Sequence, residues 1–316
     1  MAARILLTGV SGFVGGALGA HLIRHGYDVT GVSRSAPRAG STMRHITHDL
    51  ALPKVDWPSA DVIVHCAALS SPWAAPAAYR RNNVDATGNL LDHAARTGAR
   101  FVFISSSSVH YEHGDQLDIT EDTPLPGKPI NEYAASKRVA EELVRAANLH
   151  WTILRPRAVF GPGDTVLFPR ILRAAQTGSL PRIVRPDGLS PQADLIYIEN
   201  LSHYIERAIA QEATGTFNLT NNEPVSLNPF LDGMLESLHI PKPTRTVRVG
   251  TAMAFARAAE LASRYLQNYK EPPVTRFGVE VMAYSKTFHV AKMLNAFGPP
   301  PVSIAEGVER FIQSVQ

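Results

Sequence analysis

Residues 8–15 read Thr8-Gly9-Val10-Ser11-Gly12-Phe13-Val14-Gly15, and this stretch decides the fold. It follows a short apolar segment, Ile5 to Leu7, and opens a segment with helical spacing of apolar residues. Glycines between a strand and a helix permit a tight turn, and the first turn of the helix offers free N–H groups to a phosphate. The stretch therefore predicts a dinucleotide-binding turn in preference to a purely structural one. The residues expected to hold the pyrophosphate are Gly9, Ser11, Gly12, Phe13, Val14 and Gly15.

Short apolar segments alternate with helical patterns over the first half of the chain. Further strands are expected at residues 29–33, 62–66, 101–105 and 151–154, with helices at 13–25, 83–96 and 132–147. This alternation indicates βαβ units, and the nearly continuous apolar strands are typical of a parallel sheet covered on both faces. We expect an α/β fold with a Rossmann-type, doubly wound parallel sheet, to which residues 195–198 and 216–219 add late strands.

The sequence pattern changes beyond Gly161, where prolines recur between helical segments. We expect a smaller, mostly helical C-terminal cap that binds the substrate. Its last helix should begin at Ser303, because Ser303 and Glu306 have capping-box spacing. Residues 1–160 with about 195–219 would form the nucleotide-binding domain, and about 161–194 with 220–316 the cap.

The composition describes a compact protein. Of 316 residues, 45% are hydrophobic and 19% are charged, which excludes a disordered chain. The net charge of +3 is too small to indicate a nucleic-acid-binding protein. A single cysteine, Cys66, can form neither an intrachain disulfide nor a zinc site, and no metal site is expected.

The apolar segments are too short for membrane insertion. None reaches the roughly 18 residues that a membrane helix needs. The strand expected at Ile5 also leaves no room for a signal peptide. We therefore expect a cytoplasmic protein.

The tip of the second expected strand reads Ser33-Arg34-Ser35 and carries no carboxylate. An acidic residue there would accept hydrogen bonds from the ribose 2′-hydroxyl of NAD, whereas Arg34 suits a 2′-phosphate. NADP(H) is therefore favoured over NAD(H), with Ser33 and Ser35 as further donors, although a solvated surface arginine is the alternative. Asp49 and Leu50 follow the expected third strand and can reach the adenine.

Tyr133 and Lys137 have i,i+4 spacing, which places both side chains on one face of a helix. A tyrosine has a pKa near about 10 and needs a nearby cation to act as an acid–base group at neutral pH. Lys137 can supply that cation. The serine run at residues 105–108 ends a strand, where a hydroxyl can bind a substrate oxygen.

The chain resembles the extended short-chain dehydrogenase/reductase superfamily, which includes the NAD-dependent epimerases and dehydratases. The matching residues are Thr8 to Gly15, His65 to Ala68, Asn83-Val84, Ser105 to Val109, Tyr133 with Lys137, and Arg155-Pro156 through Gly161 to Asp164. The resemblance implies that Tyr133 donates or accepts the proton, that Lys137 lowers its pKa and holds the nicotinamide ribose, and that Ser106 binds the substrate oxygen.

The resemblance also assigns supporting positions. It implies that Ala67, Ala68 and Asn83 lie along the cofactor and that Pro156 and Val159 lie near its carboxamide. Leu69, Ser107 and His110 are expected near the substrate. His110 stands where the family usually has tyrosine, and a structural loop histidine is the alternative. A homodimer through the helices near Asn83 and Tyr133 is implied as well.

Residues near the expected catalytic serine and in the C-terminal part of the chain indicate which reaction of the superfamily to expect. Ser107 and Ser108 occupy the positions of the extra acid/base pair that sugar dehydratases need, which disfavours elimination. Residues 192–200 and the C-terminal segment are similar to the 3-beta-hydroxysteroid dehydrogenase branch. We expect hydride transfer between NADP(H) and a ketone or secondary alcohol, the small-molecule partner, on a largely apolar and possibly anionic substrate. The alternatives are a nucleotide-sugar 4-epimerase with tightly held NAD and a non-catalytic NADP-sensing protein.

Two segments of the expected cap, residues 165–186 and 237–259, each contain four basic residues and no acidic residue. They predict either a positive approach for an anionic substrate or a solvated outer surface. The basic residues are Arg170, Arg173, Arg182, Arg185, Lys242, Arg245, Arg248 and Arg257.

Overall fold

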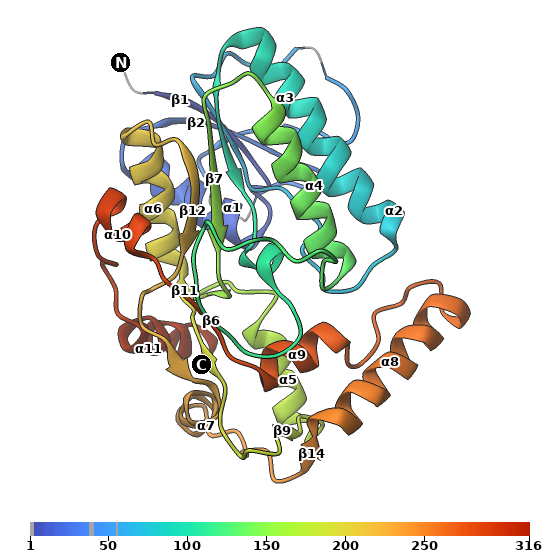
Figure 1. The fold of residues 1–316 in the computed structure, drawn as a ribbon. Helices are drawn as coiled ribbons and strands as arrows, with labels where there is room; N and C mark the ends of the chain where they lie inside the picture. Colours follow the sequence, from blue (N-terminus) through green and yellow to red (C-terminus); the bar gives the residue numbers. More distant parts are fainter. Residues whose placement is uncertain (1–2, 38–40, 55) are drawn as a thin grey trace.

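The computed structural model describes residues 3–37, 41–54 and 56–316. At its centre is a seven-stranded parallel sheet in the order β3-β2-β1-β4-β5-β7-β12 (Figure 1). The order reverses direction between β1 and β4, which confirms the doubly wound Rossmann-type fold. The strands are β1 (Arg4–Thr8), β2 (Asp28–Ser33), β3 (Arg44–Thr47), β4 (Val62–His65), β5 (Arg100–Ile104), β7 (Trp151–Pro156) and β12 (Gly215–Leu219).

Helices cover both faces of this sheet because successive strand residues point to opposite sides. Ile5 and Leu7 of β1 join the core that includes α1 (Phe13–Arg24) and α6 (Ile198–Ala210). Leu6, between them, joins the core on the other face, which includes α3 (Ala86–Thr97) and α4 (Glu132–Ala146). Figure 1 shows α1 and α6 on one side of the strands and α3 and α4 on the other.

The prediction that residues 195–198 add a strand to the central sheet is wrong. Ile196–Tyr197 forms β11, which pairs with β8 (Val159–Phe160) in a separate two-stranded sheet. β12 occupies the edge of β7, and α6 begins directly at Ile198, so β11 has only two residues, both paired with β8.

The remaining elements lie mainly beneath the central sheet in Figure 1 and form the mostly helical cap. Here α8 packs on α9, and β9 pairs with β14. These elements are α5 (Phe168–Gln176), β9 (Arg182–Val184), α7 (Leu227–Ser237), β14 (Thr246–Arg248), α8 (Val249–Leu266), α9 (Arg276–Ala283) and α11 (Ile304–Val315). As expected, Ser303 caps α11 by accepting a hydrogen bond from the Glu306 N–H.

Two elements link the parts of the chain that we expect to be separate domains. A four-stranded sheet has the order β13 (Val225–Ser226), β10 (Gln192–Ala193), β15 (Lys286–Phe288) and β6 (Gln116–Ile119), so the early strand β6 pairs with a late one. The late helix α10 (Ala291–Phe297) packs against β12 and α6. In the described part of the chain, no helix has the length and apolar character needed to cross a membrane.

Candidate active site

A cavity of about 1090 Å³ lies where the carboxyl ends of the central strands meet the cap. Most of the residues that the sequence analysis selected line this cavity. They are Gly9, Ser11, Gly12, Phe13, Val14, Gly15, Ser33, Arg34, Ser35, Asp49, Leu50, Ala67, Ala68, Ser106, Ser107, Tyr133, Lys137, Pro156 and Val159. Leu69, Asn83 and His110 are not among the lining residues.

The glycine turn leaves the space that a diphosphate needs. Gly9 has φ +77°, and a Cβ added to it would lie 2.8 Å from the Ala67 nitrogen. A Cβ on Gly15 would lie 2.3 Å from the Gly9 carbonyl oxygen, so the helix approaches the turn more closely than a side chain allows. Helix α1 begins at Phe13 and directs its free N–H groups towards this part of the cavity. These residues fit a dinucleotide cofactor.

A chain of hydrogen bonds fixes the glycine turn to the neighbouring loop. The Ala67 N–H donates to Thr8 Oγ1 (3.1 Å), and Thr8 Oγ1 lies 2.8 Å from His65 Nδ1. The Thr87 hydroxyl donates to the Asn83 carbonyl (2.6 Å), so it accepts from His65 Nε2 at 3.1 Å. His65 is therefore neutral with its proton on Nε2, and burial lowers its pKa to about 3.

Asn83 lies behind the cavity wall and connects two of its parts. Its Oδ1 accepts from the Leu69 N–H (2.7 Å), and its Nδ2 donates to the Leu69 carbonyl (3.2 Å). The same Nδ2 donates to Ser136 Oγ (2.9 Å), whose hydroxyl donates to the Tyr133 carbonyl (2.7 Å). Asn83 thus positions both the loop after β4 and the first turn of α4.

Arg34 lies at the rim of the cavity with an exposed side chain. Its Nη1 donates to Asn82 Oδ1 at 3.3 Å. Asp49 accepts a 2.7 Å hydrogen bond from Arg81, which lowers the pKa of Asp49. The Ser33 hydroxyl donates to the Ser35 carbonyl (2.7 Å), so it is engaged within the loop, and Arg34 offers the charged donors at this rim.

Tyr133 and Ser106 meet at the base of the cavity. Asn131 caps α4 by accepting from the Ala134 N–H (2.8 Å), which starts the helix just before Tyr133. Ser106 caps the short 3₁₀ helix η2 (Ser107–His110) by accepting from the Ser108 N–H (3.2 Å). Burial raises the pKa of Tyr133 to about 12, and the nearby Ser106 hydroxyl opposes this shift. Tyr133 is therefore protonated at neutral pH in this arrangement.

Lys137 lies one helical turn after Tyr133. Its Nζ donates to the Ile104 carbonyl (2.7 Å) and lies 4.7 Å from the centroid of the Phe103 ring. Burial lowers the pKa of Lys137 to about 8. The effect of Lys137 on the Tyr133 pKa stays a prediction, because here the ammonium is bound to the strand.

We expected His110 near the substrate, but its ring lies in a buried network beneath the serine run. Its Nε2 is 2.7 Å from Arg155 Nη1, and Arg155 donates to both carboxylate oxygens of Glu141 (2.8 and 2.6 Å). Ser105 donates to the same carboxylate (2.6 Å). Burial lowers the pKa of His110 to about 4, so the ring is neutral and accepts from Arg155. This arrangement fits the structural alternative.

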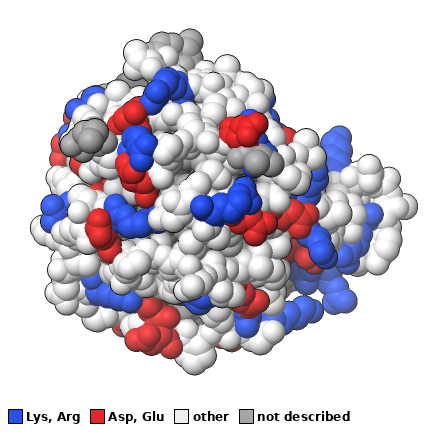
Figure 2. Space-filling model, turned by 90° about the horizontal axis from the view of Figure 1, so that it is seen from above, with Lys and Arg blue, Asp and Glu red and all other residues white. Residues whose placement is uncertain are grey.

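Four of the eight basic residues in the two acid-free cap segments have acidic partners outside those segments. The ion pairs are Arg170–Glu271 (2.6 Å), Arg182–Asp232 (2.6 Å), Arg185–Asp115 (2.7 Å) and Lys242–Glu236 (2.7 Å). Of the eight basic residues, only Arg170 and Arg245 line the cavity. On the face seen from above, away from most of the cap, basic and acidic residues are interspersed (Figure 2). A general positive approach to the pocket therefore has little support.

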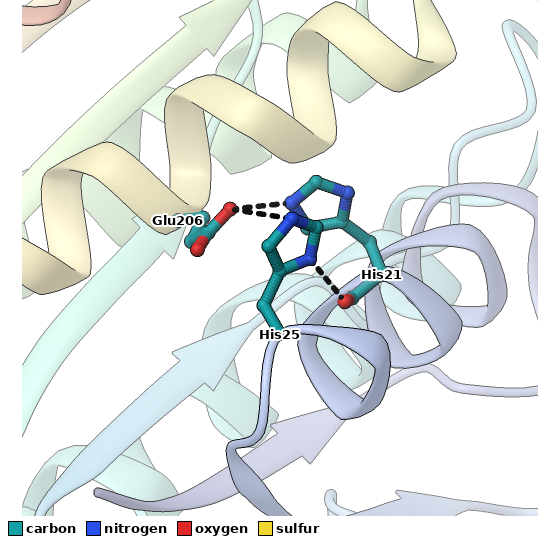
Figure 3. A group of neighbouring side chains, drawn as sticks. All are labelled: His21, His25 and Glu206. Carbon is teal, nitrogen blue, oxygen red and sulfur yellow. Dashed lines mark hydrogen bonds and ion pairs between the residues drawn. The ribbon is translucent and has the colours of Figure 1, made fainter.

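The sequence analysis missed two groups. Arg157 lines the cavity as a buried cation, and the signal was a charge directly after the apolar strand that ends at Pro156. The second group is His21, His25 and Glu206, which joins α1 to α6 away from the cavity lining (Figure 3). His21 Nε2 lies 2.6 Å from Glu206 Oε2, and the two histidines stack at 4.2 Å. Their i,i+4 spacing was the available signal.

Comparison with known proteins agrees with this geometry. Residues 5–220 match the model of the NAD dependent epimerase/dehydratase family. The 2-alkyl-3-oxoalkanoate reductase of Shewanella oneidensis is 30% identical, with 98% of this chain and 85% of the relative covered. The 3beta-hydroxysteroid-dehydrogenase/decarboxylase isoform 1 of Arabidopsis thaliana is 30% identical, with 93% and 71% covered.

Among solved structures, MoeE5 in complex with UDP-glucose and NAD is similar over 99% of this chain and 98% of its own, with a TM-score of 0.76 and 25% identity. The family model covers more than half of the chain, and relatives named as reductases and dehydrogenases cover nearly all of it. The chain therefore belongs to the NAD dependent epimerase/dehydratase family and is an enzyme of the NAD(P)-dependent dehydrogenase/reductase type.

Proposed function

We propose that this protein is an NADP(H)-dependent oxidoreductase that interconverts a ketone and a secondary alcohol on a largely apolar substrate. The observation that carries the proposal is that Ser106 and the protonated Tyr133 line the same cavity, with the Ser106 hydroxyl near enough to oppose the rise in the Tyr133 pKa. Two relatives are named for related chemistry, reduction of 3-oxoalkanoates and dehydrogenation of 3-hydroxysteroids.

The side chains divide the acid–base work. In the reductive direction Tyr133 donates its phenolic proton to the carbonyl oxygen, and the Ser106 hydroxyl orients that oxygen. When bound, the nicotinamide cofactor supplies the hydride. Proton transfer of this kind contributes about 10²–10⁴-fold to the rate. In the oxidative direction Tyr133 accepts the alcohol proton, a step that the buried ammonium of Lys137 would favour by stabilising the phenolate.

The cap side of the cavity determines the apolar character of the substrate. Its wall consists mainly of aliphatic and aromatic side chains that can contact an alkyl or ring system. These residues include Val166, Leu167, Ile171, Leu180, Val247, Phe255, Val274, Phe277 and Met282. The cofactor preference rests on Arg34, the charged donor at the rim next to the position of a ribose 2′-phosphate.

A nucleotide-sugar 4-epimerase is the second candidate, because the fold is similar to that of MoeE5, whose structure contains UDP-glucose and NAD. An epimerase would keep NAD bound through purification and would show no net consumption of added NADPH. The test follows absorbance at 340 nm with NADPH or NADH and a panel of neutral and anionic ketones. Steady oxidation of NADPH supports the reductase, whereas tightly held NAD with no net turnover supports the epimerase.

We also propose that the protein forms a homodimer through α3 and α4. Val139 and Leu143 lie one turn apart on α4, and their side chains are 42% and 37% exposed. Burial of this pair against a second copy would remove apolar surface from water. Size-exclusion chromatography with light scattering tests this: Val139→Glu should convert a dimer into a monomer.

A further inference from the structure

Arg157 is a buried cation that has no counter-charge in contact among the residues that the structure describes. It follows β7 and lines the cavity, with 8% of its surface exposed. Among the described residues its guanidinium makes no hydrogen bond and no ion pair, and its Nε is fully buried without a partner. The group instead lies over the face of Tyr111, with Cζ 5.5 Å from the ring centroid.

This state differs from that of Arg155, two residues earlier. Arg155 is still more deeply buried, with 2% of its surface exposed, but it binds Glu141 through two nitrogens and contacts His110. Arg157 does influence the Asp194 carboxylate electrostatically, yet Asp194 Oδ2 accepts a 2.8 Å hydrogen bond from the Phe288 N–H. Burial of an unpaired guanidinium is unfavourable, so its retention in a cavity wall points to a ligand that completes it.

The guanidinium lies close to the reacting part of the cavity. Tyr111, on which it packs, has its Oη 3.1 Å from Ser107 Oγ, and Ser107 directly follows Ser106. Ala158, the next residue, has φ +43°, a left-handed conformation that is costly for a residue with a Cβ. Strained backbone of this kind gathers at ligand sites, and here it lies between Arg157 and Val159, which both line the cavity.

We propose that Arg157 binds a carboxylate of the substrate, so that the cavity selects apolar acids whose carbonyl or hydroxyl lies near the acid group, as in a 3-oxo or 3-hydroxy acid. The proposal rests on the function proposed above. The guanidinium fork matches a carboxylate through two parallel hydrogen bonds, and binding there would satisfy nitrogens that the protein leaves free.

The other basic residues of the wall serve as comparisons. Arg170 is neutralised by Glu271 at 2.6 Å, and Arg245 is exposed. A residue that acts only through the overall field would affect an acid from either position. A direct contact would be lost only when Arg157 changes.

The experiment measures NADP⁺ reduction at 340 nm with 3-hydroxydecanoate and with its methyl ester, for the wild type, Arg157→Gln, Arg157→Lys and the control Arg245→Gln. Loss of a charge-assisted hydrogen bond should lower kcat/KM for the acid at least about 10-fold in Arg157→Gln. The value for the ester and the KM for NADP⁺ should not change. Arg157→Lys should recover part of the loss, and Arg157→Gln should not lower Tm, because no protein partner is left unpaired.

Three results would overturn the proposal: equal losses for acid and ester, the same loss in Arg245→Gln, or a lowered Tm with a raised KM for NADP⁺. If the wild type oxidises neither compound, the function proposed above fails separately. In that case, calorimetric titration of 3-hydroxydecanoate and its ester into Tyr133→Phe with bound NADP⁺ tests whether Arg157 binds the carboxylate. Acid-selective binding that Arg157→Gln removes supports the subsite, and equal binding of acid and ester excludes it.

Discussion

Asn83 donates a 2.9 Å hydrogen bond to Ser136, which stands between Tyr133 and Lys137 on α4. The same carboxamide binds both backbone groups of Leu69. Asn83→Leu, a change of similar size, should lower the free energy of unfolding by about 2–4 kcal/mol, because buried polar groups lose their partners. The KM for NADPH should rise as the loop after β4 loosens.

Urea unfolding and NADPH titration measure both effects. Asn200→Leu is the control, since Asn200 is similarly buried and its carboxamide binds Asn221 and Val302, away from the cavity lining. It should cost a similar amount of stability and leave the KM unchanged. Equal effects of the two variants on the KM would show that Asn83 has no special role in positioning the site.

Replacement by alanine should change the stability of the protein in opposite directions at Gly15 and at Gly88. A Cβ at Gly15 would lie 2.3 Å from the Gly9 oxygen, whereas a Cβ at Gly88, within α3, would meet nothing within 4 Å. Gly15→Ala should cost at least about 2 kcal/mol and weaken NADPH binding. Gly88→Ala should raise stability by about 0.5–1 kcal/mol. Thermal unfolding with and without NADPH distinguishes the outcomes, and a stable Gly15→Ala that binds NADPH normally would contradict the close approach.

Tyr133→Phe should remove the proton that reduction needs while preserving the shape of the wall. Turnover should fall by about 10²–10⁴-fold, with the Kd for NADPH nearly unchanged. Fluorescence titration measures the Kd, and assays at 340 nm measure turnover. Loss of folding together with NADPH binding would assign Tyr133 a structural role instead.

Arg34→Ser should change the cofactor preference. A charge-assisted hydrogen bond contributes about 1.5–3 kcal/mol, so kcat/KM for NADPH should fall about 10- to 100-fold while that for NADH stays constant. Arg44→Ser is the matched control. Arg44 begins β3, at the end of the strands opposite to Arg34, and pairs with Asp28. Parallel losses with both cofactors would refute a 2′-phosphate contact.

His65 and His110 should make the protein less stable in acid. Their pKa values in the folded state, about 3 and about 4, lie below the ordinary value of 6.5. The unfolded chain therefore binds protons first, so their stabilising effect is complete above about pH 6.5 and declines as the pH falls towards these values. Each contributes up to about 1.4 kcal/mol per pH unit.

His110→Gln isolates one of these contributions, since a glutamine oxygen can still accept from Arg155. Urea midpoints between pH 7.5 and about 4.5 should show a slope lower than that of the wild type by about 1.4 kcal/mol per pH unit below pH 6. An unchanged slope would mean that His110 is charged in the folded protein.

The sequence predicted the parts of the fold that depend on local pattern. Ile5 to Leu7 and the glycines after them are sufficient for β1, its turn and α1, and the Tyr133–Lys137 spacing is sufficient for their placement on α4. The error at residues 195–198 arose because a two-residue strand at Ile196–Tyr197 has the same composition as a strand of the main sheet.

Ion pairs and contacts between residues far apart in the sequence could not be predicted. The acid-free segments looked strongly basic, but Arg170 pairs with Glu271, 101 residues away, and no local pattern shows such a partner. For the same reason the role of His110 could not be decided, since it depends on Arg155 and Glu141. Arg157 was missed because its significance lies in having no hydrogen-bond or ion-pair partner in the described part of the chain, which only the folded structure reveals.

Arg155 and Arg157, at the end of β7, differ in what their replacement would cost the fold. Arg155 is tied to Glu141, so its replacement would endanger the fold. Arg157 has no such tie, so mutation can replace it without disrupting an internal partner. If Arg157 binds the substrate carboxylate as proposed, replacement at position 157 alone would change the charge of the accepted substrate, while Arg155 keeps the scaffold constant.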